Sequence, residues 1–118
     1  MPGKFEVKTT ANGQFMFNLK AGNGEIVLTS ETYKTKAACL AGVESVRKNA
    51  ASDASFDRRD SKNGEPYFAL KATNGQDIGR SEMYKSKSSR ERGIQSVMRN
   101  APTAKLVELA ATAKAAKA

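Results

Sequence analysis

The chain has 118 residues, of which 39% are hydrophobic, so it can form one compact core but not two ordinary independent domains. Its formal net charge of +8 makes nucleic acid, an anionic surface or an acidic protein a plausible partner. A single cysteine excludes an intramolecular disulfide and fits a reducing compartment, and the absence of histidine removes the commonest general base.

The sequence gives no sign of a membrane segment or of a cofactor site. No apolar signal region begins the chain, and no apolar run approaches the length of a membrane span. The Asn-Gly pairs lack the pattern of a phosphate-binding loop, and one cysteine cannot build a thiolate metal site. We therefore expect a cytoplasmic protein without a membrane partner, metal or cofactor.

The sequence repeats itself with a displacement of 51 positions. Residues 5–50 align without a gap with residues 56–101, and about two in five aligned positions are identical. We predict one pseudo-twofold domain over residues 1–109, with a first repeat at about residues 3–53 and a second at about residues 54–109. Residues 110–118, rich in alanine and lysine, are predicted to be a disordered tail.

Three strands are predicted at the start of the first repeat. Alternating apolar residues indicate strands at residues 4–10 and 15–20, joined by a type I′ turn centred on Asn12 and Gly13. A second Asn-Gly pair leads into an apolar strand at residues 25–30, where Val27 is the predicted inward residue because its equivalent is Ile78.

The second repeat begins the same pattern at Phe56 but departs from it at two positions. Arg58 stands where the first repeat has Val7, which favours an edge strand. Pro66 replaces Phe15 and fits an edge or the start of a strand, because proline cannot donate to a sheet ladder. A last short strand is predicted within residues 104–109.

One helix follows the three strands of each repeat, with Thr35 and Ser86 as the predicted N-caps. Both helices are expected to end at an Asn-Ala pair and to keep a glycine on the inner face for close packing. The predicted inner faces are Cys39, Gly42, Val43 and Val46 in the first helix and Arg90, Gly93, Ile94 and Val97 in the second. This order predicts an α+β fold in which one antiparallel sheet carries both helices on the same face.

Four motifs of the first repeat resemble the YegP-like proteins, a bacterial group with a domain of unknown function. They are Phe-Asn-Leu-Lys-Ala-Gly-Asn-Gly-Glu at residues 17–25, Ser-Glu-Thr-Tyr at 30–33, Lys-Ala-Ala-Cys at 36–39 and Gly-Val-Glu-Ser-Val at 42–46, and the second repeat has Ser-Glu-Met-Tyr at 81–84. The resemblance implies tandem β3-α-β motifs that exchange their last strands, with residues 56–59 and 105–109 as the exchanged strands. It implies no catalytic or ligand-binding residues.

Few residues are suited to catalysis. Cys39 could in principle be a nucleophile near a helix start, but its place on the apolar helix face favours a packing role. Ser30 and Ser81 lie near lysines, as serines do by chance in any lysine-rich chain. We therefore expect no enzymatic activity; an enzyme that uses serine, lysine and tyrosine is the remote alternative.

Two surfaces are candidates for interactions. The duplicated Ser-Glu-x-Tyr-Lys-x-Lys motif would place lysines beside helix N-termini, where anions bind, although its serine and tyrosine fit structural roles as well. The uncovered sheet face should combine Lys8, Met16, Asn18 and Ala69 with further basic and aromatic residues, as a solvated face or as a platform for single strands. The candidate interaction residues are Lys20, Tyr67, Lys71, Tyr33, Lys36, Tyr84 and Lys87.

The resulting expectation is a monomer with internal pseudo-dimer symmetry that serves as an interaction or structural module for an unknown protein partner. The alternative is a weak, sequence-tolerant nucleic-acid binder that uses the basic open sheet face.

Overall fold

The computed structural model describes residues 3–108, so the predicted tail at residues 110–118 lies outside the described range. The strands are β1 (Lys4–Thr9), β2 (Phe15–Lys20), β3 (Ile26–Ser30), β4 (Phe56–Asp60), β5 (Pro66–Lys71), β6 (Asp77–Arg80) and β7 (Lys105–Glu108). The helices are α1 (Lys36–Asn49), α2 (Lys87–Asn100) and the short 3-10 helix η1 (Asp53–Ser55).

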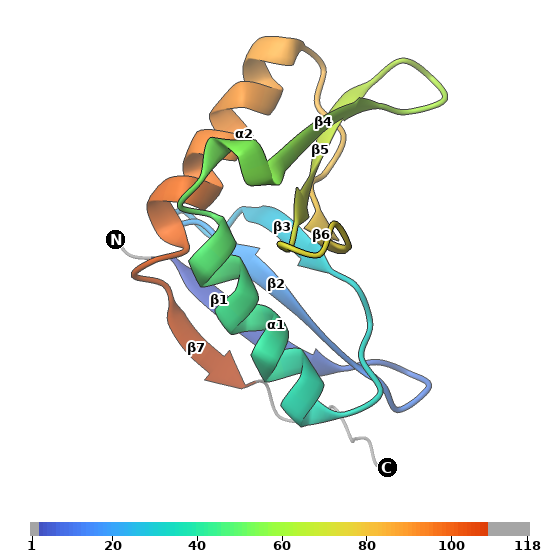
Figure 1. The fold of residues 1–118 in the computed structure, drawn as a ribbon, viewed down its shortest axis with the longest axis vertical. Coiled ribbons are helices and arrows are strands. Elements are labelled where there is room, and N and C mark those ends of the chain that lie inside the picture. Colours follow the sequence, from blue (N-terminus) through green and yellow to red (C-terminus); the bar gives the residue numbers. More distant parts are fainter. Residues whose placement is uncertain (1–2, 109–118) are drawn as a thin grey trace.

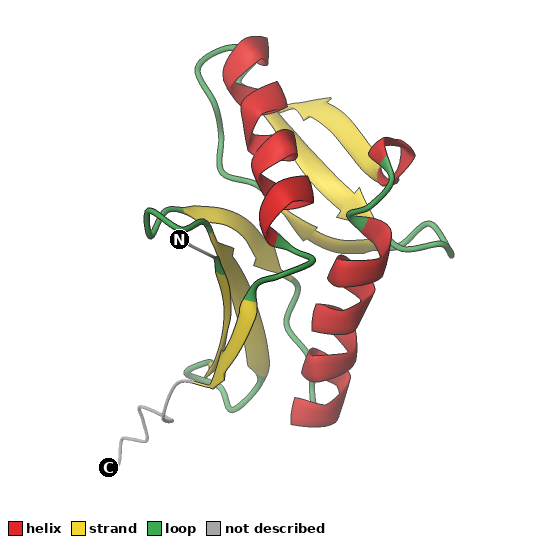
Figure 2. Ribbon diagram, turned by 90° about the vertical axis from the view of Figure 1, so that its left-hand side faces the viewer, coloured by secondary structure: helices red, strands yellow, loops and turns green. Residues whose placement is uncertain are grey.

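These strands form one sheet in the order β4-β5-β6-β3-β2-β1-β7 (Figure 1). Both helices pack on the same side of the sheet, and α1 contacts strands of both repeats (Figure 2). The two repeats meet where β3 pairs with β6, and Thr29 lies opposite Arg80 there. Because these two residues are equivalent in the repeats, the pseudo-twofold axis passes between them. The predicted α+β fold of tandem repeats is confirmed.

β7 departs from the predicted wholly antiparallel sheet. It pairs with β1 in parallel, starting with a hydrogen bond of 3.1 Å from the Lys105 N–H to the Gly3 carbonyl, so the sheet is mixed. The connection through α2 takes the chain from β6 to the opposite edge of the sheet, where β7 adds beside β1. The implied exchange is confirmed for β7, which completes the first repeat.

The other strand with an implied exchange, β4, has a different role. It follows α1 and lies at the edge of the second half of the sheet, paired antiparallel with β5 from Phe56↔Leu70 to Asp60↔Pro66. It is therefore the first strand of the second repeat. Only three residues separate α1 from η1, and β4 begins directly after η1. The chain between α1 and β4 is therefore too short to hold an additional, exchanged strand.

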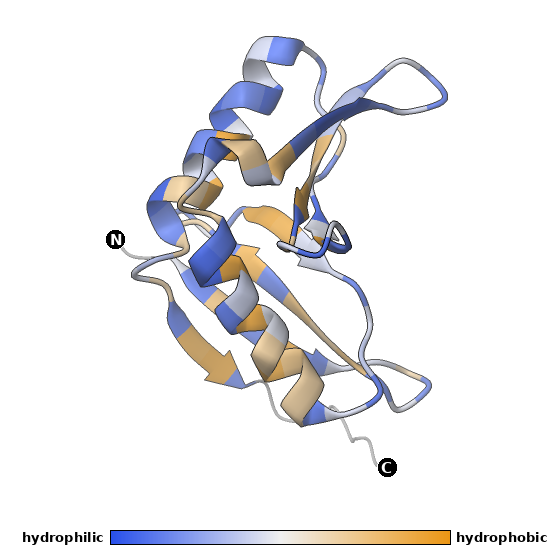
Figure 3. Ribbon diagram, viewed as in Figure 1, coloured by the Kyte–Doolittle hydropathy of each residue, from blue (hydrophilic) through white to orange (hydrophobic). Residues whose placement is uncertain are grey.

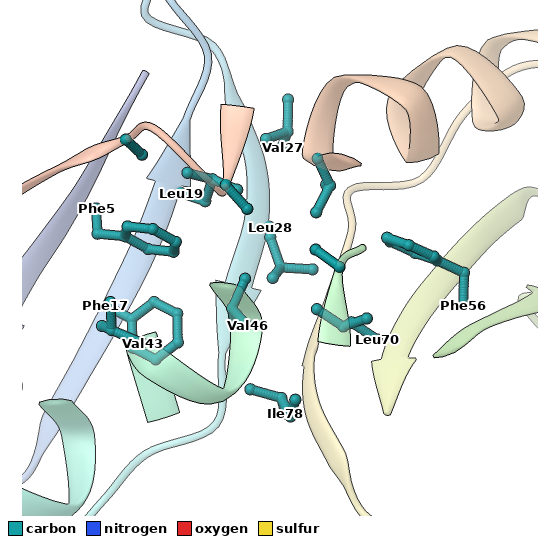
Figure 4. Close-up of a cluster of buried hydrophobic side chains, with 14 of the residues drawn as sticks. Phe5, Phe17, Leu19, Val27, Leu28, Val43, Val46, Phe56, Leu70 and Ile78 are labelled. Carbon is teal, nitrogen blue, oxygen red and sulfur yellow. The ribbon is translucent and has the colours of Figure 1, made fainter. Parts of the chain in front are cut away.

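One continuous core lies between the sheet and the two helices (Figure 4). Its two halves use the same aromatic geometry: Phe5 meets Phe17 edge to face at 5.8 Å between ring centroids, and Phe56 meets Phe68 at 5.7 Å. The predicted inner faces of both helices are buried as expected. Cys39 is fully buried among core residues, which confirms its packing role.

A bulge between β2 and β3 explains how two consecutive residues of β3 both reach the core. The pairing shifts between Leu19 and Lys20, so that Leu28 lies opposite Leu19 while Val27 has no direct partner. Val27 is 6% exposed, as its prediction as an inward residue requires, and Leu28 is fully buried. Strict alternation along the sequence could not predict Leu28 as a second inward residue.

The hairpin turns differ from the predicted type I′ form. The Gly13 N–H donates to the Thr10 carbonyl at 3.0 Å, which makes Ala11 and Asn12 the central turn residues, and Gly13 follows them at φ +83°. This is the three-residue hairpin loop that ends in a glycine bulge. Asn-Gly fits both loop types, so the dipeptide alone does not fix the loop length.

Pro66 and Arg58 occupy the places that their sequence pattern predicts. Pro66 begins β5 and accepts a hydrogen bond of 2.8 Å from the Tyr84 N–H. Arg58 lies on the edge strand β4, and its guanidinium contacts carboxylate oxygens of Glu91 and Asp53 at 2.8 and 3.0 Å. An ion pair thus replaces an apolar contact at the position equivalent to Val7.

Candidate functional site

Tyr33 and Tyr84 lie at equivalent places between a helix and the sheet. The Tyr33 ring stacks on Phe17, with 6.4 Å between centroids and 9° between planes, and Tyr84 stacks on Phe68 at 6.2 Å and 12°. Partial burial raises the pKa of both hydroxyls above the ordinary value, and nearby acidic groups such as Glu31 add to this effect. Both tyrosines are therefore neutral hydrogen-bonding groups at physiological pH.

The helix glycines make room for these tyrosines. A Cβ atom at Gly42 would overlap the Tyr33 hydroxyl and lie 2.8 Å from its Cζ, and a Cβ at Gly93 would overlap the Tyr84 hydroxyl and lie 2.6 Å from its Cζ. The same hypothetical atoms would be 3.1 Å from the Cε2 atoms of the phenylalanines below. The tyrosine ring, more than the sheet itself, requires glycine at these positions.

The serines of the duplicated motif hold the backbone together. The buried Ser30 hydroxyl accepts a 2.8 Å hydrogen bond from the Phe17 N–H and donates one of 2.7 Å to the Glu31 carbonyl. Ser81 makes the same pair of bonds, at 3.0 Å from the Phe68 N–H and 2.8 Å to the next carbonyl. Each hydroxyl thus serves a strand that would otherwise carry an unsatisfied buried N–H.

The glutamates of the motif have no comparable structural role. The side chains of Glu31 and Glu82 are exposed, and neither makes an ion pair or hydrogen bond within residues 3–108. The same is true of Lys34 and Lys85, which are also identical between the repeats. These four residues are identical in the two repeats although they have no structural partner in the described range. The serine and tyrosine beside them, in contrast, have structural roles.

Two shallow clefts, related by the pseudo-twofold axis, contain these glutamates. Glu31 and Tyr33 of the first repeat line one cleft of about 400 Å³ together with Asp77 near the Asn-Gly turn of the second repeat. Glu82 and Tyr84 line the other, of about 470 Å³, with Glu25 and Ile26 of the first repeat. Each cleft is thus built from both repeats, and the contributing positions correspond.

The charged residues that line the two clefts are all carboxylates, although the whole chain is basic. The clefts differ in how free these groups are. Asp77 accepts two hydrogen bonds from Arg59, at 2.9 and 3.0 Å, which hold its pKa below the ordinary value. In the other cleft, Glu25 makes no ion pair with any residue of the described range. The carboxylates that remain available to a cation are therefore Glu25 and Glu82 in one cleft and Glu31 in the other.

The predicted binding residues of the open sheet face lie on β2 and on β5, which β3 and β6 separate, and their charges are largely paired. Lys20 lies 2.9 Å from Glu6, and Lys71 lies 3.9 Å from Asp57, which also pairs with Arg59 at 2.8 Å. Asn18 and Ala69 on this face are buried. Tyr67 is half-buried on β5, opposite Arg59 of β4. The open face is thus a network of mixed charge rather than a uniformly basic platform.

The two predicted helix-start lysines differ from each other. Lys36 begins α1 and forms an ion pair with Glu108 of β7. Lys87 begins α2, is exposed, and makes no ion pair within the described range. The N-caps next to them are as predicted, because Thr35 accepts from the Ala38 N–H and Ser86 from the Ser89 N–H, each at 3.1 Å.

The described residues were also compared with the requirements of a metal site and of a membrane-spanning helix. Within residues 3–108, no three side chains of acidic residues, cysteine or histidine gather in a way that could hold a metal ion. No helix of this range is long and apolar enough to cross a membrane.

Sequence reasoning included Glu31 and Glu82 in the duplicated motif but, unlike the tyrosines, not among the candidate interaction residues. The signal for them was present, because both glutamates are identical in the repeats. The carboxylates on the opposite walls of the clefts, Asp77 and Glu25, could not be found by comparing the repeats. Each belongs to the repeat opposite to that of its glutamate, and the β3–β6 pairing brings the two repeats together.

Comparisons with known proteins place the chain in a family. A family model described as a domain of unknown function (DUF1508) matches residues 11–57 and again residues 61–108. A UPF0339 protein of Bordetella pertussis is 56% identical over 88% of this chain and 93% of its own length. A UPF0339 protein of Mannheimia succiniciproducens is 54% identical over 86% of this chain and 89% of its own.

Two solved structures share the fold. The solution NMR structure of UPF0339 protein SO3888 from Shewanella oneidensis is 47% identical, with a TM-score of 0.87 and 92% of each chain covered. That of yegP from E. coli is 44% identical, also with a TM-score of 0.87, and covers 92% of this chain and 93% of its own. Both repeats match one family model, and the resemblance to YegP-like proteins is confirmed: the chain belongs to the DUF1508 family of tandem-repeat UPF0339 proteins.

Proposed function

We propose that the protein is a non-enzymatic binding module that holds a positively charged segment of a partner protein in its two equivalent clefts. The observation that carries this proposal is the pair Glu31 and Glu82, identical in the repeats, exposed, and without a structural partner in the described range. Each lies in a cleft whose other charged lining residue is also a carboxylate.

The chemistry of the clefts suits the side chains of arginine and lysine. Carboxylates form charge-assisted hydrogen bonds with guanidinium and ammonium groups, and arginine can bond to them in a bidentate way. The neutral hydroxyls of Tyr33 and Tyr84 add a polar group to a partly apolar wall. Two clefts on one rigid sheet would also let a partner with two basic segments bind both at once, which raises its affinity.

The state of the nucleophile candidates supports a non-enzymatic role. Burial raises the pKa of the Cys39 thiol, which disfavours the reactive thiolate. The hydroxyls of Ser30 and Ser81 are engaged by backbone groups on both sides. The raised pKa of Tyr33 and Tyr84 disfavours a phenolate in the clefts.

The alternative of nucleic-acid binding through the open sheet face has less support. Lys20, Lys71 and Arg59 on this face each have an acidic partner, so a phosphate would have to replace an existing ion pair at these positions, and only Lys8 of the named cations makes no ion pair within residues 3–108. Among residues 3–108, only the ring of Tyr67 is offered for stacking on this face. Sequence-tolerant binding of single strands uses several such rings along the groove.

The test measures the fluorescence anisotropy of a labelled arginine-rich peptide at near-physiological salt, where long-range repulsion from the basic protein is screened. The Glu31→Gln/Glu82→Gln variant keeps the shape of both side chains and removes their charge. We expect it to bind the peptide about tenfold more weakly than the wild-type protein, as the loss of one charge-assisted contact per cleft requires.

A matched control distinguishes the loss of the cleft carboxylates from a change in net charge. The Asp60→Asn/Glu65→Gln variant changes the net charge equally at two exposed positions outside the clefts. It should bind the peptide as the wild-type protein does. The proposal would be contradicted if both variants bound the peptide equally weakly, or if the wild-type protein did not bind it.

A further inference from the structure

The two helical segments of the molecule differ in charge although their folds are equivalent. Residues 83–107, which contain α2, hold six basic residues and one acidic residue. The equivalent residues 32–56, which contain α1, hold four basic and two acidic residues. The excess positive charge of the chain is therefore concentrated on the side of the second helix.

The outward face of α2 is polar and basic along its whole length. Ser88, Arg92, Gln95 and Arg99 are all exposed, and their spacing places them in one line opposite the buried face of the helix. The equivalent line on α1 consists of Ala37, Ala41, Glu44 and Lys48. Figure 3 shows this contrast, with the first half of α2 largely hydrophilic and the first half of α1 largely hydrophobic.

The cations on this line are not neutralised by the protein's own carboxylates. The one acidic residue of α2, Glu91, lies on its flank, where it contacts Arg58 at 2.8 Å and Arg90 at 3.2 Å. Arg92 and Arg99 make no ion pair within residues 3–108. Lys20 and Lys36, in contrast, each have an acidic partner.

We infer that the outward face of α2 is a contact surface for the phosphate backbone of nucleic acid. A straight line of exposed cations fits a linear polyanion, and the guanidinium fork of arginine matches phosphate oxygens. Gln95 supplies a neutral hydrogen-bonding group between the two arginines, and Ser88 supplies another before them. Phosphate contacts carry no sequence information, so the binding is sequence-tolerant. A membrane surface fits less well, because this line has no apolar side chain to insert into lipid.

This surface shares no lining residue with the acidic clefts, so it is tested separately. A short labelled DNA duplex of mixed sequence is titrated with the whole protein at salt concentrations from about 50 to about 200 mM. The Arg92→Gln/Arg99→Gln variant is compared with a control of the same net charge, Lys8→Gln/Lys62→Gln, which changes β1 and the β4–β5 turn. Each cation in contact with a phosphate contributes about 0.9 to the slope of log affinity against log salt.

We expect the helix variant to bind more weakly and to lower the salt slope by about 2, while the control keeps the wild-type slope. Equal losses in both variants would assign the binding to net charge alone and overturn the inference. It would also be overturned if the wild-type protein did not bind the duplex at low salt. Competition by poly-glutamate as strong as that by unlabelled duplex would assign the surface to acidic proteins instead.

Discussion

Gly93 and Tyr84 share one small space between α2 and the sheet, and neither side chain can change without affecting the other. The tyrosine ring is held between Phe68 on one side and the helix backbone on the other. Gly42 and Tyr33 repeat this arrangement in the first repeat. A helix-interior glycine costs about 1 kcal/mol relative to alanine, so the tyrosine must offset that cost in both places.

We predict that Gly93→Ala destabilises the protein by about 1–2 kcal/mol, because overpacking of about 1–3 kcal/mol exceeds the gain in helix propensity. Urea unfolding followed by circular dichroism measures the free energy of unfolding. In a Tyr84→Phe background, where the overlapping hydroxyl is gone, the same substitution should cost less. Identical costs in both backgrounds would show that the tyrosine is not the reason for the glycine.

The duplicated motif contains residues with two different roles, and sequence alone could not separate them. Ser30 satisfies a buried N–H of β2, whereas Glu31 beside it points to a cleft without a structural partner in the described range. Both are identical in the two repeats. The N–H that donates to the serine comes from a neighbouring strand, so the distinction depends on strand pairing rather than on the motif.

At the scale of elements, hydrophobic period and capping residues were sufficient to predict the helices and most strands. Helix α1 begins after Thr35 and ends at Asn49, as its cap and Asn-Ala pair indicate. The parallel pairing of β7 could not be predicted from the residues, because Leu106 and Val107 fit a parallel or an antiparallel edge equally well. The pairing depends on where the connection through α2 ends, which is at the edge beside β1.

β7 joins the end of the described chain to its beginning, so it should protect β1. We predict that Lys105→Pro, which removes the hydrogen bond to Gly3 and introduces a fixed φ, destabilises the protein by about 1–3 kcal/mol. Hydrogen exchange of the β1 amides should become faster at the same time.

Lys105→Ala is the control for this change, because it removes the side chain but keeps the N–H. It should leave the exchange of β1 close to that of the wild-type protein. Unchanged protection of β1 in the proline variant would mean that β7 contributes nothing to the first repeat.

At the scale of the whole molecule, ion pairs on the open face connect strands within each half of the sheet. Arg59 of β4 reaches across β5 to Asp77 of β6, and Glu6 of β1 pairs with Lys20 of β2. Hydrogen bonds from these cations lower the pKa of both carboxyls in the folded state. A carboxyl whose pKa is lower in the folded state stabilises the protein at pH values above its unfolded-state pKa of about 4. This stabilisation is lost as the pH falls through the folded-state pKa.

We therefore predict that the free energy of unfolding decreases as pH falls from about 5 to about 2. The Arg59→Gln variant should show a smaller decrease over this range, because Asp77 then loses the hydrogen bonds that do most to lower its pKa. Urea titrations at several pH values provide the measurement. If both proteins lost the same stability on acidification, the Arg59–Asp77 pair would not be a source of the pH dependence.

The architecture of the whole molecule was largely predictable, because two similar halves with three strands and a helix can share one core in few ways. The clefts were not predictable. Each one combines Glu31 or Glu82 with residues from the opposite repeat, and the pairing of Thr29 with Arg80 sets that relation. The charge state of the open face was also misjudged, because Glu6 and Asp57 were not considered as partners for the lysines.

The most direct test of the proposed function is a map of amide chemical shifts in isotopically labelled protein during titration with the arginine-rich peptide. The proposal predicts that the largest shifts occur in two matching sets, around Glu31 and Tyr33 in one cleft and around Glu82 and Tyr84 in the other. Shifts confined to the open face of β1, β2 and β5, or no shifts at concentrations that saturate the anisotropy signal, would contradict it.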